Sequence, residues 1–470
     1  MASVFAGLGL LILHLMAAVM AFRAIQTART PQGSVGWVVF LLAAPWFAVP
    51  SYLFLGQSRY RGYSIERGKS EAVVAHFERH AEVYPPATAP LPAGLRALQS
   101  ITGLPVTGGN RARLLIDGQQ TFDAILAAID GARSYVLIQF YILRDDGLGR
   151  RLRDALAAAA GRGVTVRLLY DAVGSAGLPD SYLAALRKAG VQVMDVHRLR
   201  GPKTRFQLNF RNHRKTVVVD GQTGFIGGLN VGDEYLGLSA RFGAWRDTHL
   251  QLRGPVVDQL QAVFAEDWHW ATEETIIAAL DHARPVEGPG QDALIVATGP
   301  ADDFETGELF FLQLIEMARA RLWIASPYFV PDLAILKALK LAALRGVAVR
   351  ILVPDMIDHR MPWLSAFAYF DEVRAAGVEI WRYQAGFMHQ KVVLVDDHTA
   401  TVGTHNLDNR SFRLNFEASA VIADPGFAAE IAAMFEADFA RAARMARTLG
   451  EQPRHVRLGA PVARLFAPLL

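Results

Sequence analysis

The sequence contains no cysteine, and this absence removes several kinds of chemistry at once. Disulfide bonds, thiolate nucleophiles and cysteine-bound zinc are all excluded. Net charge is also small, because 48 Lys and Arg residues against 45 Asp and Glu residues give a formal charge of +3 over 470 residues. A polyanion-binding function therefore has to be argued from local clusters rather than from net charge. The length is sufficient for two domains of ordinary size.

Long hydrophobic runs, in contrast, are present and lie at the N-terminus. Ser3–Phe22 is apolar except for His14, and Ser34–Leu55 is a second apolar run that contains Pro45 and Pro50. About twenty apolar residues in a helix cross the hydrocarbon core of a bilayer, and proline is tolerated better in such helices than in soluble ones. We therefore expect a transmembrane helical hairpin before the soluble part of the chain.

Two alternatives to a spanning hairpin remain open. A cleaved signal peptide is disfavoured, because the first run lacks a basic segment before it and a second apolar run follows at once. The prolines could also break the second helix and give a re-entrant or interfacial hairpin. The residues used to predict orientation are Arg23 and Arg29 between the runs, and Arg59, Arg61, Arg67 and Lys69 after them. The excess after the second run predicts that the bulk of the chain and the N-terminus are cytoplasmic.

One motif, His-x-Lys-x4-Asp-x6-Gly-x-x-Asn, occurs twice. The first copy consists of His213, Lys215, Asp220, Gly227 and Asn230. The second copy consists of His389, Lys391, Asp396, Gly403 and Asn406. Such a repeat at fixed offsets is very improbable by chance. It implies two half-sites that meet to form one site, with two imidazoles facing one anion.

The segments around the motifs repeat as well. A buried strand within 132–143 corresponds to one within 320–330, and RGVTVRLLYD and RGVAVRILVPD follow them in the same order. Strands that alternate with helices indicate an α/β layered fold with mostly parallel pairing. The expected boundaries are a two-helix membrane hairpin at 1–60, a Pro-rich linker at 61–110, a first domain at 111–285, a second domain at 286–445 and a C-terminal interfacial tail at 446–470.

The residue types of the motif suit attack on a phosphodiester. Residues two apart in a strand point to the same face, so the histidine and lysine of each copy project together. The lysine neutralises phosphate oxygens, one neutral histidine attacks phosphorus, and the other, protonated, gives its proton to the leaving alcohol. Asn230 and Asn406 can donate amide hydrogens to the same oxygens. Asp220 and Asp396 belong to the motif as orienting or structural partners more than as proton carriers.

A metal site is the competing interpretation, because His and Asp clusters bind metals. The lysines would repel a cation, and the asparagines and glycines would have no role, so neither a metal nor another cofactor is expected. The first copy also carries extra residues before its motif, among them Arg198, Arg200, Lys203 and Arg205. A clamp for anionic headgroups and a solvated loop are both open for these residues.

The paired motifs resemble the HKD motifs of the phospholipase D superfamily, and the resemblance extends over nearly the whole chain to bacterial cardiolipin synthases. It includes RTPQGSVGWV from Arg29, WRDTHL from Trp245 and HNLDNRSFRLNFE from His405. It implies two phospholipase D-like domains related by a pseudo-twofold axis, with mixed sheets flanked by helices. It also implies a metal-independent phosphohistidine mechanism with His213 as nucleophile and His389 as acid and base.

The same resemblance implies further site residues. Asp247 and Glu417 lie at similar distances past the two motifs and are expected to orient the histidines. Superfamily members often carry serine after the motif glycine, where this chain has Gly228 and Thr404. Thr404 is therefore expected to contact the substrate phosphate, and the corresponding contact is missing from the first half-site.

The function that the resemblance implies is transphosphatidylation in a bacterial inner membrane, with the catalytic domains on the cytoplasmic side. One phosphatidylglycerol gives its phosphatidyl group to the enzyme, glycerol leaves, and the hydroxyl of a second phosphatidylglycerol attacks to form cardiolipin. Phosphatidylethanolamine as one substrate remains an alternative, as does a hydrolase that uses water. The expected partners are phospholipids and the bilayer, and the oligomeric state is open.

Two other classes of function are less well supported. A membrane-tethered nuclease would use the same residues, but it should carry a long basic groove with stacking aromatics, and no nucleic-acid partner is expected. A non-enzymatic lipid-binding scaffold would have been free to lose a histidine or lysine from one motif. The segments 360–370 and 454–470 mix apolar with basic residues, and both membrane contact and ordinary core packing are open for them.

Overall fold

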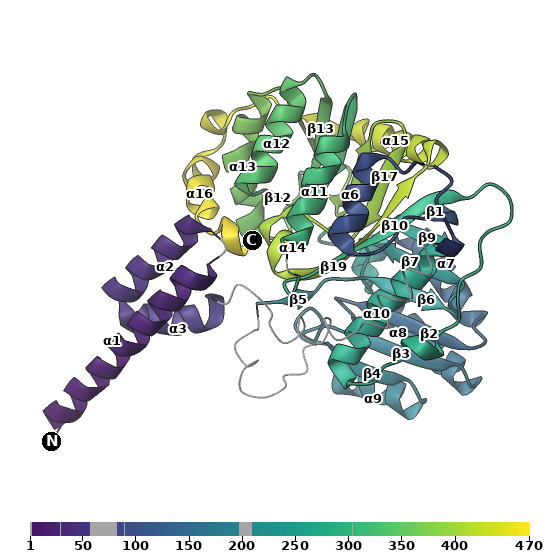
Figure 1. Cartoon of the computed structure of the whole chain (residues 1–470), viewed down its shortest axis with the longest axis horizontal. Helices are drawn as coiled ribbons and strands as arrows, with labels where there is room; N and C mark the ends of the chain where they lie inside the picture. Colours follow the sequence, from purple (N-terminus) through teal and green to yellow (C-terminus); the bar gives the residue numbers. More distant parts are fainter. Residues whose placement is uncertain (1, 29, 57–81, 89, 197–208, 303) are drawn as a thin grey trace.

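The N-terminal part of the computed structural model is a compact group of apolar helices (Figure 1). The structure describes residues 2–28, 30–56, 82–88, 90–196, 209–302 and 304–470. The first helices are α1 (Ala2–Thr27), α2 (Pro31–Ala43) and α3 (Pro45–Leu55). Ala17, Leu41 and Ala48 lie in the core that these helices share. The expected hairpin is present, with one long arm and one arm made of two short helices.

Proline explains the broken second arm. Pro45 begins α3 directly after α2, because proline lacks an N–H group and restricts the backbone of the residue before it. Within the described ranges, α1 alone has a stretch long and apolar enough to cross a membrane, Gly7–Thr27. The basic residues Arg59, Arg61, Arg67 and Lys69, on which the predicted orientation depends, lie outside the described residues.

The first half of the globular part contains helices on both sides of a sheet. Its helices are α6 (Ala93–Thr102), α7 (Asp117–Asp130), α8 (Gly147–Gly161), α9 (Asp180–Lys188) and α10 (Val256–Thr272), with short 3₁₀ turns η1 (Asp233–Leu236) and η2 (Ile277–Ala279). Its strands are β1 (Thr107–Ile116), β2 (Tyr135–Phe140), β3 (Thr165–Tyr170), β4 (Gln192–Asp195), β5 (Arg211–Asn212), β6 (Thr216–Val219), β7 (Thr223–Gly227), β8 (Trp245–Arg246) and β9 (Thr248–Arg253).

The second half repeats this order. Its helices are α11 (Thr306–Met317), α12 (Leu333–Leu344), α13 (Arg360–Arg374), α14 (Asn409–Arg413), α15 (Pro425–Phe439) and α16 (Arg454–Arg464), with η3 (Leu449–Glu451) and η4 (Ala467–Leu469). Its strands are β10 (Gln291–Thr298), β11 (Arg321–Ala325), β12 (Phe329–Val330), β13 (Ala348–Pro354), β14 (Glu379–Tyr383), β15 (Phe387–Met388), β16 (Val392–Val395), β17 (Thr399–Gly403), β18 (Leu407–Asp408), β19 (Asn415–Ala423) and β20 (Ala442–Arg444).

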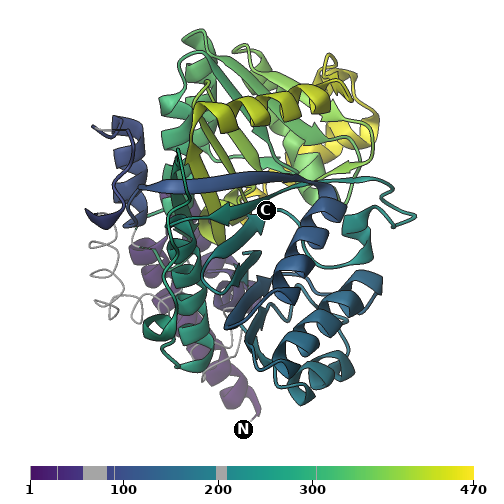
Figure 2. The same ribbon diagram turned by 90° about the vertical axis from the view of Figure 1, so that its right-hand side faces the viewer.

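One sheet runs through both halves, in the order β20-β14-β13-β11-β16-β17-β19-β10-β1-β9-β7-β6-β2-β3-β4. The order reads the same outward from the β10–β1 pair, apart from the edge strand β20, so a pseudo-twofold axis passes between these strands. Figure 2 shows β1, in dark blue, crossing between the two halves. β2, β3 and β4 are parallel, as are β11, β13 and β14. The remaining central pairs are antiparallel, so the expectation of mostly parallel pairing is wrong.

The hydrophobic core also joins the halves. Leu260 and Phe264 of α10 belong to the same buried cluster as Ile431 and Phe435 of α15. Within the segment 61–110, which the sequence predicts as a linker, α6 is a packed helix. Its Leu95 and Leu98 lie in the core of the second half. Phe367, Tyr369 and Phe370 of α13 are buried too, which favours core packing over membrane contact for the segment 360–370.

Asp220 and Asp396 perform the same structural task in the two halves. Both have a positive φ, 50° and 52°. The Asp220 carboxylate accepts hydrogen bonds from the backbone N–H groups of residues 133–135 at 2.8 to 2.9 Å. The Asp396 carboxylate accepts them from residues 319–321 at 2.7 to 3.2 Å. These contacts fit the expectation that the two motif aspartates are structural partners, since β6 and β16 separate them from the motif histidines.

We expect Asp396→Ala to lower the free energy of unfolding by about 1–3 kcal/mol, because backbone donors lose their acceptor. The remaining folded enzyme should keep its turnover number. Thermal unfolding in detergent, with activity normalised to folded protein, measures both quantities. Asp397→Ala is the matched control, because that neighbouring carboxylate is exposed and makes an ion pair with Arg321 at the surface. Lost turnover at unchanged stability would mean that Asp396 has a catalytic role.

Candidate active site

The two His-x-Lys segments meet at the boundary between the halves. They do so because a short strand from each half pairs with a strand of the other half. β5 of the first half pairs with β19 of the second, and β15 of the second pairs with β8 of the first. These exchanges continue into the motifs. The His213 N–H donates to the Phe416 carbonyl at 2.9 Å, and the His389 N–H donates to the Arg246 carbonyl at 2.8 Å. Each motif histidine is thus attached to the opposite half.

A carboxylate from the opposite half holds each histidine ring. His213 Nδ1 donates to Glu417 Oε2 at 2.9 Å, and His389 Nδ1 donates to Asp247 Oδ2 at 2.8 Å. Both carboxylates are fully buried, while the two histidines are 9% and 8% exposed. With Nδ1 engaged, Nε2 is the ring atom that remains for a ligand. Glu417 and Asp247, the expected orienting acids, each contact a motif histidine. Each acid belongs to the half opposite its histidine, which the spacing did not predict.

The protonation of these groups follows from burial and neighbouring charges. Burial lowers the pKa of His389 to about 4, with Lys391 acting in the same direction and Asp247 opposing both. Burial also lowers the pKa of His213, with Glu417 opposing it. Burial alone would raise the pKa of Glu417, but His213 brings it down to about 2. In the free protein both histidines are therefore neutral at physiological pH and Glu417 is ionised.

The residues that follow the motif glycines fit the two carboxylates. The Thr404 hydroxyl donates to Glu417 Oε2 at 2.6 Å. In the free protein the Thr404 hydroxyl therefore contacts the orienting acid, and its expected contact with the substrate phosphate stays a prediction. At Gly228 an added Cβ would lie 2.0 Å from Asp247 Oδ1. Gly228 therefore leaves the space that Asp247 occupies.

The two motif lysines are buried cations. Lys215 Nζ donates to the His213 carbonyl at 2.6 Å, and Lys391 Nζ lies 2.9 Å from His389 Nδ1. Burial lowers the pKa of Lys391 to about 8, and it lowers that of Lys215 well below its usual value. Neither lysine forms an ion pair with a carboxylate among the described residues. Buried ammonium groups in this situation favour binding of an anion.

The side chains of the two motif asparagines use only part of their hydrogen-bonding capacity within the protein. Asn230 accepts a hydrogen bond from the Ile142 N–H at 3.1 Å and donates to the Tyr235 hydroxyl at 3.2 Å. The Asn406 side chain hydrogen-bonds to Asp408. An amide nitrogen carries two hydrogens, so each asparagine retains one for a ligand.

Several residues of the site were not predicted. The ring of Tyr141 lies 5.1 Å from that of His213, and Lys215 Nζ lies 5.3 Å from the Tyr141 ring. On the other side, Trp245 and Phe387 lie 5.3 and 5.9 Å from the His389 ring. Trp245 begins the segment WRDTHL, which carries the family resemblance, and this was the only signal for it in the sequence.

Two buried ion pairs support the strands that carry the motif histidines. Arg214, the middle residue of the first His-x-Lys, makes two hydrogen bonds to Asp267 at 2.7 and 2.8 Å. Arg246 makes the equivalent pair with Asp438, with both distances 2.8 Å, and Gln390 donates to the same carboxylate at 2.8 Å. All of these side chains are buried. The middle residues of the two motifs thus anchor the strands that carry the histidines.

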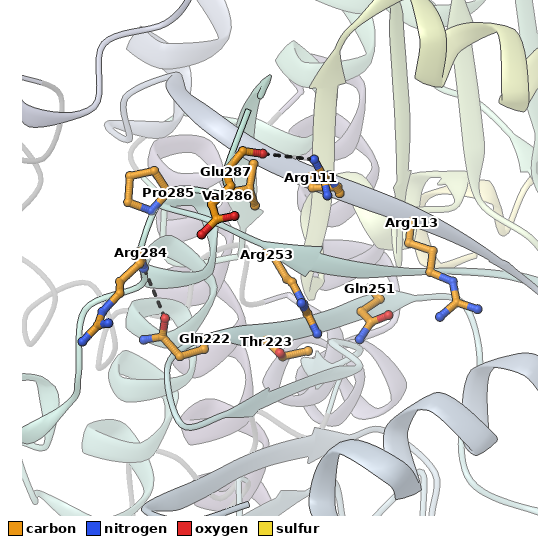
Figure 3. A pocket seen from close by; sticks show the side chains of 10 residues that line it. All are labelled: Arg111, Arg113, Gln222, Thr223, Gln251, Arg253, Arg284, Pro285, Val286 and Glu287. Carbon is orange, nitrogen blue, oxygen red and sulfur yellow. Dashed lines mark hydrogen bonds between the residues drawn. The ribbon is translucent and has the colours of Figure 1, made fainter. Parts of the chain in front are cut away.

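Other features lie away from this centre. The proposed clamp residues Arg198, Arg200, Lys203 and Arg205 fall outside the described residues. An arginine-rich groove of about 710 Å³ lies on β1, β7 and β9, and no motif histidine, lysine or asparagine lines it. Figure 3 shows Arg111, Arg113, Arg253 and Arg284 around this groove. The part of the chain that the structure describes has no group of three or more His, Asp or Glu side chains placed to hold a metal ion.

Comparison with known proteins agrees with this geometry. A family model described as "Cardiolipin synthase, PLD-like domain" matches residues 125–268 and 311–439, one motif in each. Cardiolipin synthase A of Pseudomonas aeruginosa is 46% identical over 476 residues, which cover 98% of this chain and 96% of the relative. Cardiolipin synthase A of Pseudomonas putida is 46% identical over 478 residues, with 98% and 97% covered.

A solved structure shows the same fold. The crystal structure of phosphatidylserine synthase from Haemophilus influenzae superposes with a TM-score of 0.60 at 16% identity. It covers 80% of this chain and 100% of that chain. The expected architecture of two repeated halves is therefore confirmed.

Proposed function

Because this chain belongs to the family of phospholipase D-like cardiolipin synthases, we propose that it transfers a phosphatidyl group from one phosphatidylglycerol to another, giving cardiolipin and glycerol. The observation that carries the proposal is a pair of buried lysines, neither in a direct ion pair among the described residues, beside two histidines held by exchanged carboxylates. Such a centre suits one phosphodiester anion between two imidazoles. The chain is a phospholipid phosphatidyltransferase of a membrane.

In the first half-reaction, His213 Nε2 attacks the phosphorus of the donor lipid. A P–N bond forms while the P–O bond to glycerol breaks, and Glu417 stabilises the positive charge that develops on the imidazole. His389, protonated and held by Asp247, gives its proton to the departing glycerol oxygen. The lysines and the free amide hydrogens of the asparagines stabilise the negative charge on the phosphate oxygens.

In the second half-reaction, the hydroxyl of another phosphatidylglycerol gives its proton to His389 and attacks phosphorus. The P–N bond breaks, and the product is cardiolipin. Water in the place of the lipid hydroxyl would give phosphatidic acid, which is the runner-up function. Phosphatidylethanolamine as one of the two lipids is a further alternative that uses the same residues.

His389, the general acid, takes up its proton when the substrate binds. A histidine with a pKa of about 4 is neutral in the free protein at physiological pH. The phosphodiester brings a negative charge beside it, and a nearby opposite charge raises the pKa of a histidine. We therefore infer that donor binding is accompanied by uptake of a proton.

We also propose the cellular arrangement and the domain division expected above. The helices α1 to α3 insert into a bacterial inner membrane, and residues 111–285 and 286–445 form the catalytic halves on the cytoplasmic side. The apolar stretch Gly7–Thr27 supports membrane insertion. The shared sheet and core support treating the two halves as one catalytic unit.

The C-terminal helix α16 offers a second membrane contact. One face packs inward through Val456, Ala460 and Ala463. Leu458, Val462 and Leu465 follow helical spacing on the outside and are 74%, 57% and 78% exposed. Arginines flank this stripe, as is typical of a helix that lies in the headgroup region. In Figure 1, α16 lies on the side of the globular part that faces the N-terminal helices.

We expect purified protein in detergent to convert labelled phosphatidylglycerol, without added metal, into cardiolipin and an equal amount of glycerol. Mass spectrometry of the lipids measures the products. His213→Ala and His389→Ala should each abolish turnover, while His398→Ala, an exposed histidine outside the centre, should not. Phosphatidic acid as the sole product would mean that water is the acceptor. Synthesis retained in both histidine variants would contradict the two-histidine mechanism.

The orienting acids predict which limb of the pH–kcat profile each histidine controls. Glu417→Gln removes a group that raises the pKa of His213, and Asp247→Asn does the same for His389. If His213 attacks while neutral, Glu417→Gln should move the acid limb to lower pH. If His389 acts while protonated, Asp247→Asn should move the alkaline limb to lower pH. Both variants should lower kcat by at least about tenfold. The reverse pattern of limbs would exchange the two roles.

The α16 stripe predicts a difference between bilayers and micelles. Replacing Leu458, Val462 and Leu465 together by serine should lower cardiolipin synthesis in liposomes several-fold, because the enzyme loses apolar contact with the bilayer. Activity on detergent-dispersed lipid should stay near that of the unchanged protein. Leu238→Ser is the control, since this leucine is exposed elsewhere. An equal loss in both systems would mean that the stripe supports the fold.

A further inference from the structure

Synthesis of cardiolipin from two phosphatidylglycerols requires room for two phosphates, and this inference rests on the proposed function. The catalytic centre holds the phosphate that is transferred. The acceptor lipid keeps its own phosphodiester, which only its glycerol separates from the attacking hydroxyl. A second anion must therefore be held close to the first, and the two motif lysines are already occupied.

Two arginines lie near each other at the edge of the centre beside His213, since Arg410 donates to Asn209, two residues before Arg211 in the chain. Arg211 lies in β5, two positions before the histidine, and Arg410 lies in α14, four positions after Asn406. Both are half-buried. Burial lowers the pKa of Arg410, and the charge of Arg211 lowers it further, as expected for neighbouring guanidinium groups. Burial raises the pKa of Tyr141, and the positive charges of both arginines oppose this rise. The Tyr141 ring contacts His213.

The contacts of these arginines fix their position without neutralising them. Arg410 donates to the Asn209 carbonyl at 2.7 Å, to Asn209 Oδ1 at 3.1 Å and to the Leu469 carbonyl at 3.3 Å. Arg211 donates to the Phe210 carbonyl at 2.9 Å. All of these acceptors are uncharged. Within the described ranges, neither guanidinium has a carboxylate at ion-pair distance.

The acids nearest to Arg410 have other partners. Asp408 caps α14 by accepting from the Ser411 N–H at 2.7 Å, and Glu417 holds His213. Two neighbouring, half-buried cations that lack a direct ion pair with any described carboxylate repel each other, and an anion that binds both would offset this repulsion. Guanidinium groups match phosphate oxygens with paired N–H donors, so a phosphodiester suits them.

The pseudo-twofold repeat indicates that the arginine pair is an addition to one half-site. The position of Arg211 in β5 corresponds to Phe387 in β15, because both lie two residues before a motif histidine. The position of Arg410 corresponds to Glu234, four residues after Asn230. Phe387 packs on Trp245 with ring centroids 4.8 Å apart, and Glu234 faces Arg144 at 3.8 Å. The histidines and lysines are duplicated, whereas the cation pair is present on one side only.

We propose that Arg211 and Arg410 bind the phosphodiester of the acceptor phospholipid. The pair selects a lipid alcohol that carries a phosphate over water or an uncharged alcohol. The transferred phosphate remains between the two histidine–lysine pairs, so donor attack does not depend on the arginines. Chemistry at phosphorus is unchanged: the P–N bond breaks and a P–O bond to the acceptor forms, whichever alcohol is used.

Two reactions that share the phosphohistidine separate the acceptor from the donor. Transfer to phosphatidylglycerol makes cardiolipin, whereas transfer to labelled free glycerol remakes phosphatidylglycerol with an acceptor that has no phosphate. Arg211→Gln and Arg410→Gln should each lower cardiolipin synthesis by about tenfold or more, consistent with loss of a charge-assisted hydrogen bond. Glycerol exchange should stay within about twofold of the unchanged protein, which also reports that the variants fold.

Matched variants sharpen the comparison. Arg211→Lys keeps the charge and should recover part of the synthesis. Arg253→Gln changes an arginine in the groove of Figure 3, away from the centre, and should leave both reactions unchanged. The readout is the ratio of cardiolipin to exchanged phosphatidylglycerol at fixed glycerol concentration, measured over a range of lipid mole fractions in micelles.

The outcomes distinguish this inference from the proposed function. If the unchanged protein makes no cardiolipin, the proposed function itself is wrong. If it makes cardiolipin and the two glutamine variants lose both reactions equally, the arginines support the centre or the fold and do not bind the acceptor. An unchanged ratio in both glutamine variants would likewise overturn the assignment of the acceptor phosphate to these residues.

Discussion

The exchanged histidine–carboxylate pairs are the interactions on which the rest of the site depends. Glu417 fixes His213 and Asp247 fixes His389, and in each case the acid and the base come from different halves. A buried carboxylate is stable only with partners, and each of these has a histidine and further hydrogen bonds. The β5–β19 and β15–β8 pairings, together with the sheet that runs through both halves, hold the two pairs in one centre.

The two halves differ in the orienting acid and in the residue that packs against it after the motif glycine. Asp247 is short and is approached closely by the backbone at Gly228, where an added Cβ would clash. Glu417 is longer and receives the hydroxyl of Thr404 at the equivalent position. The acid and the residue after the motif glycine therefore have to change together. A serine at position 228 would require a different orienting acid or a shifted strand.

The sequence was sufficient for the local parts of the site and insufficient for those that depend on tertiary pairing. The spacing of His213 and Lys215 predicts that they project together, whatever the fold around them. The exchange of Glu417 and Asp247 between halves follows from the pairing of β5 with β19 and of β15 with β8, which no periodicity records. The backbone contacts of Asp220 could not be predicted, because its partners lie more than eighty positions earlier in the chain. Antiparallel pairing was missed because buried β6 and β16 read like parallel core strands.

Charge balance connects the chemistry of the centre with the need for a second anion site. Two buried lysines already lower the pKa of the histidines, so a third cation is unfavourable until an anion arrives. The donor phosphodiester supplies that anion and allows His389 to take up its proton. In the donor complex two lysines and one imidazolium then face three anions, the phosphodiester and the carboxylates of Asp247 and Glu417, so this centre leaves no anion over for an arginine pair. Among the described residues Arg211 and Arg410 have no carboxylate at ion-pair distance, and an acceptor that carries its own phosphate is the substrate that pairs with them.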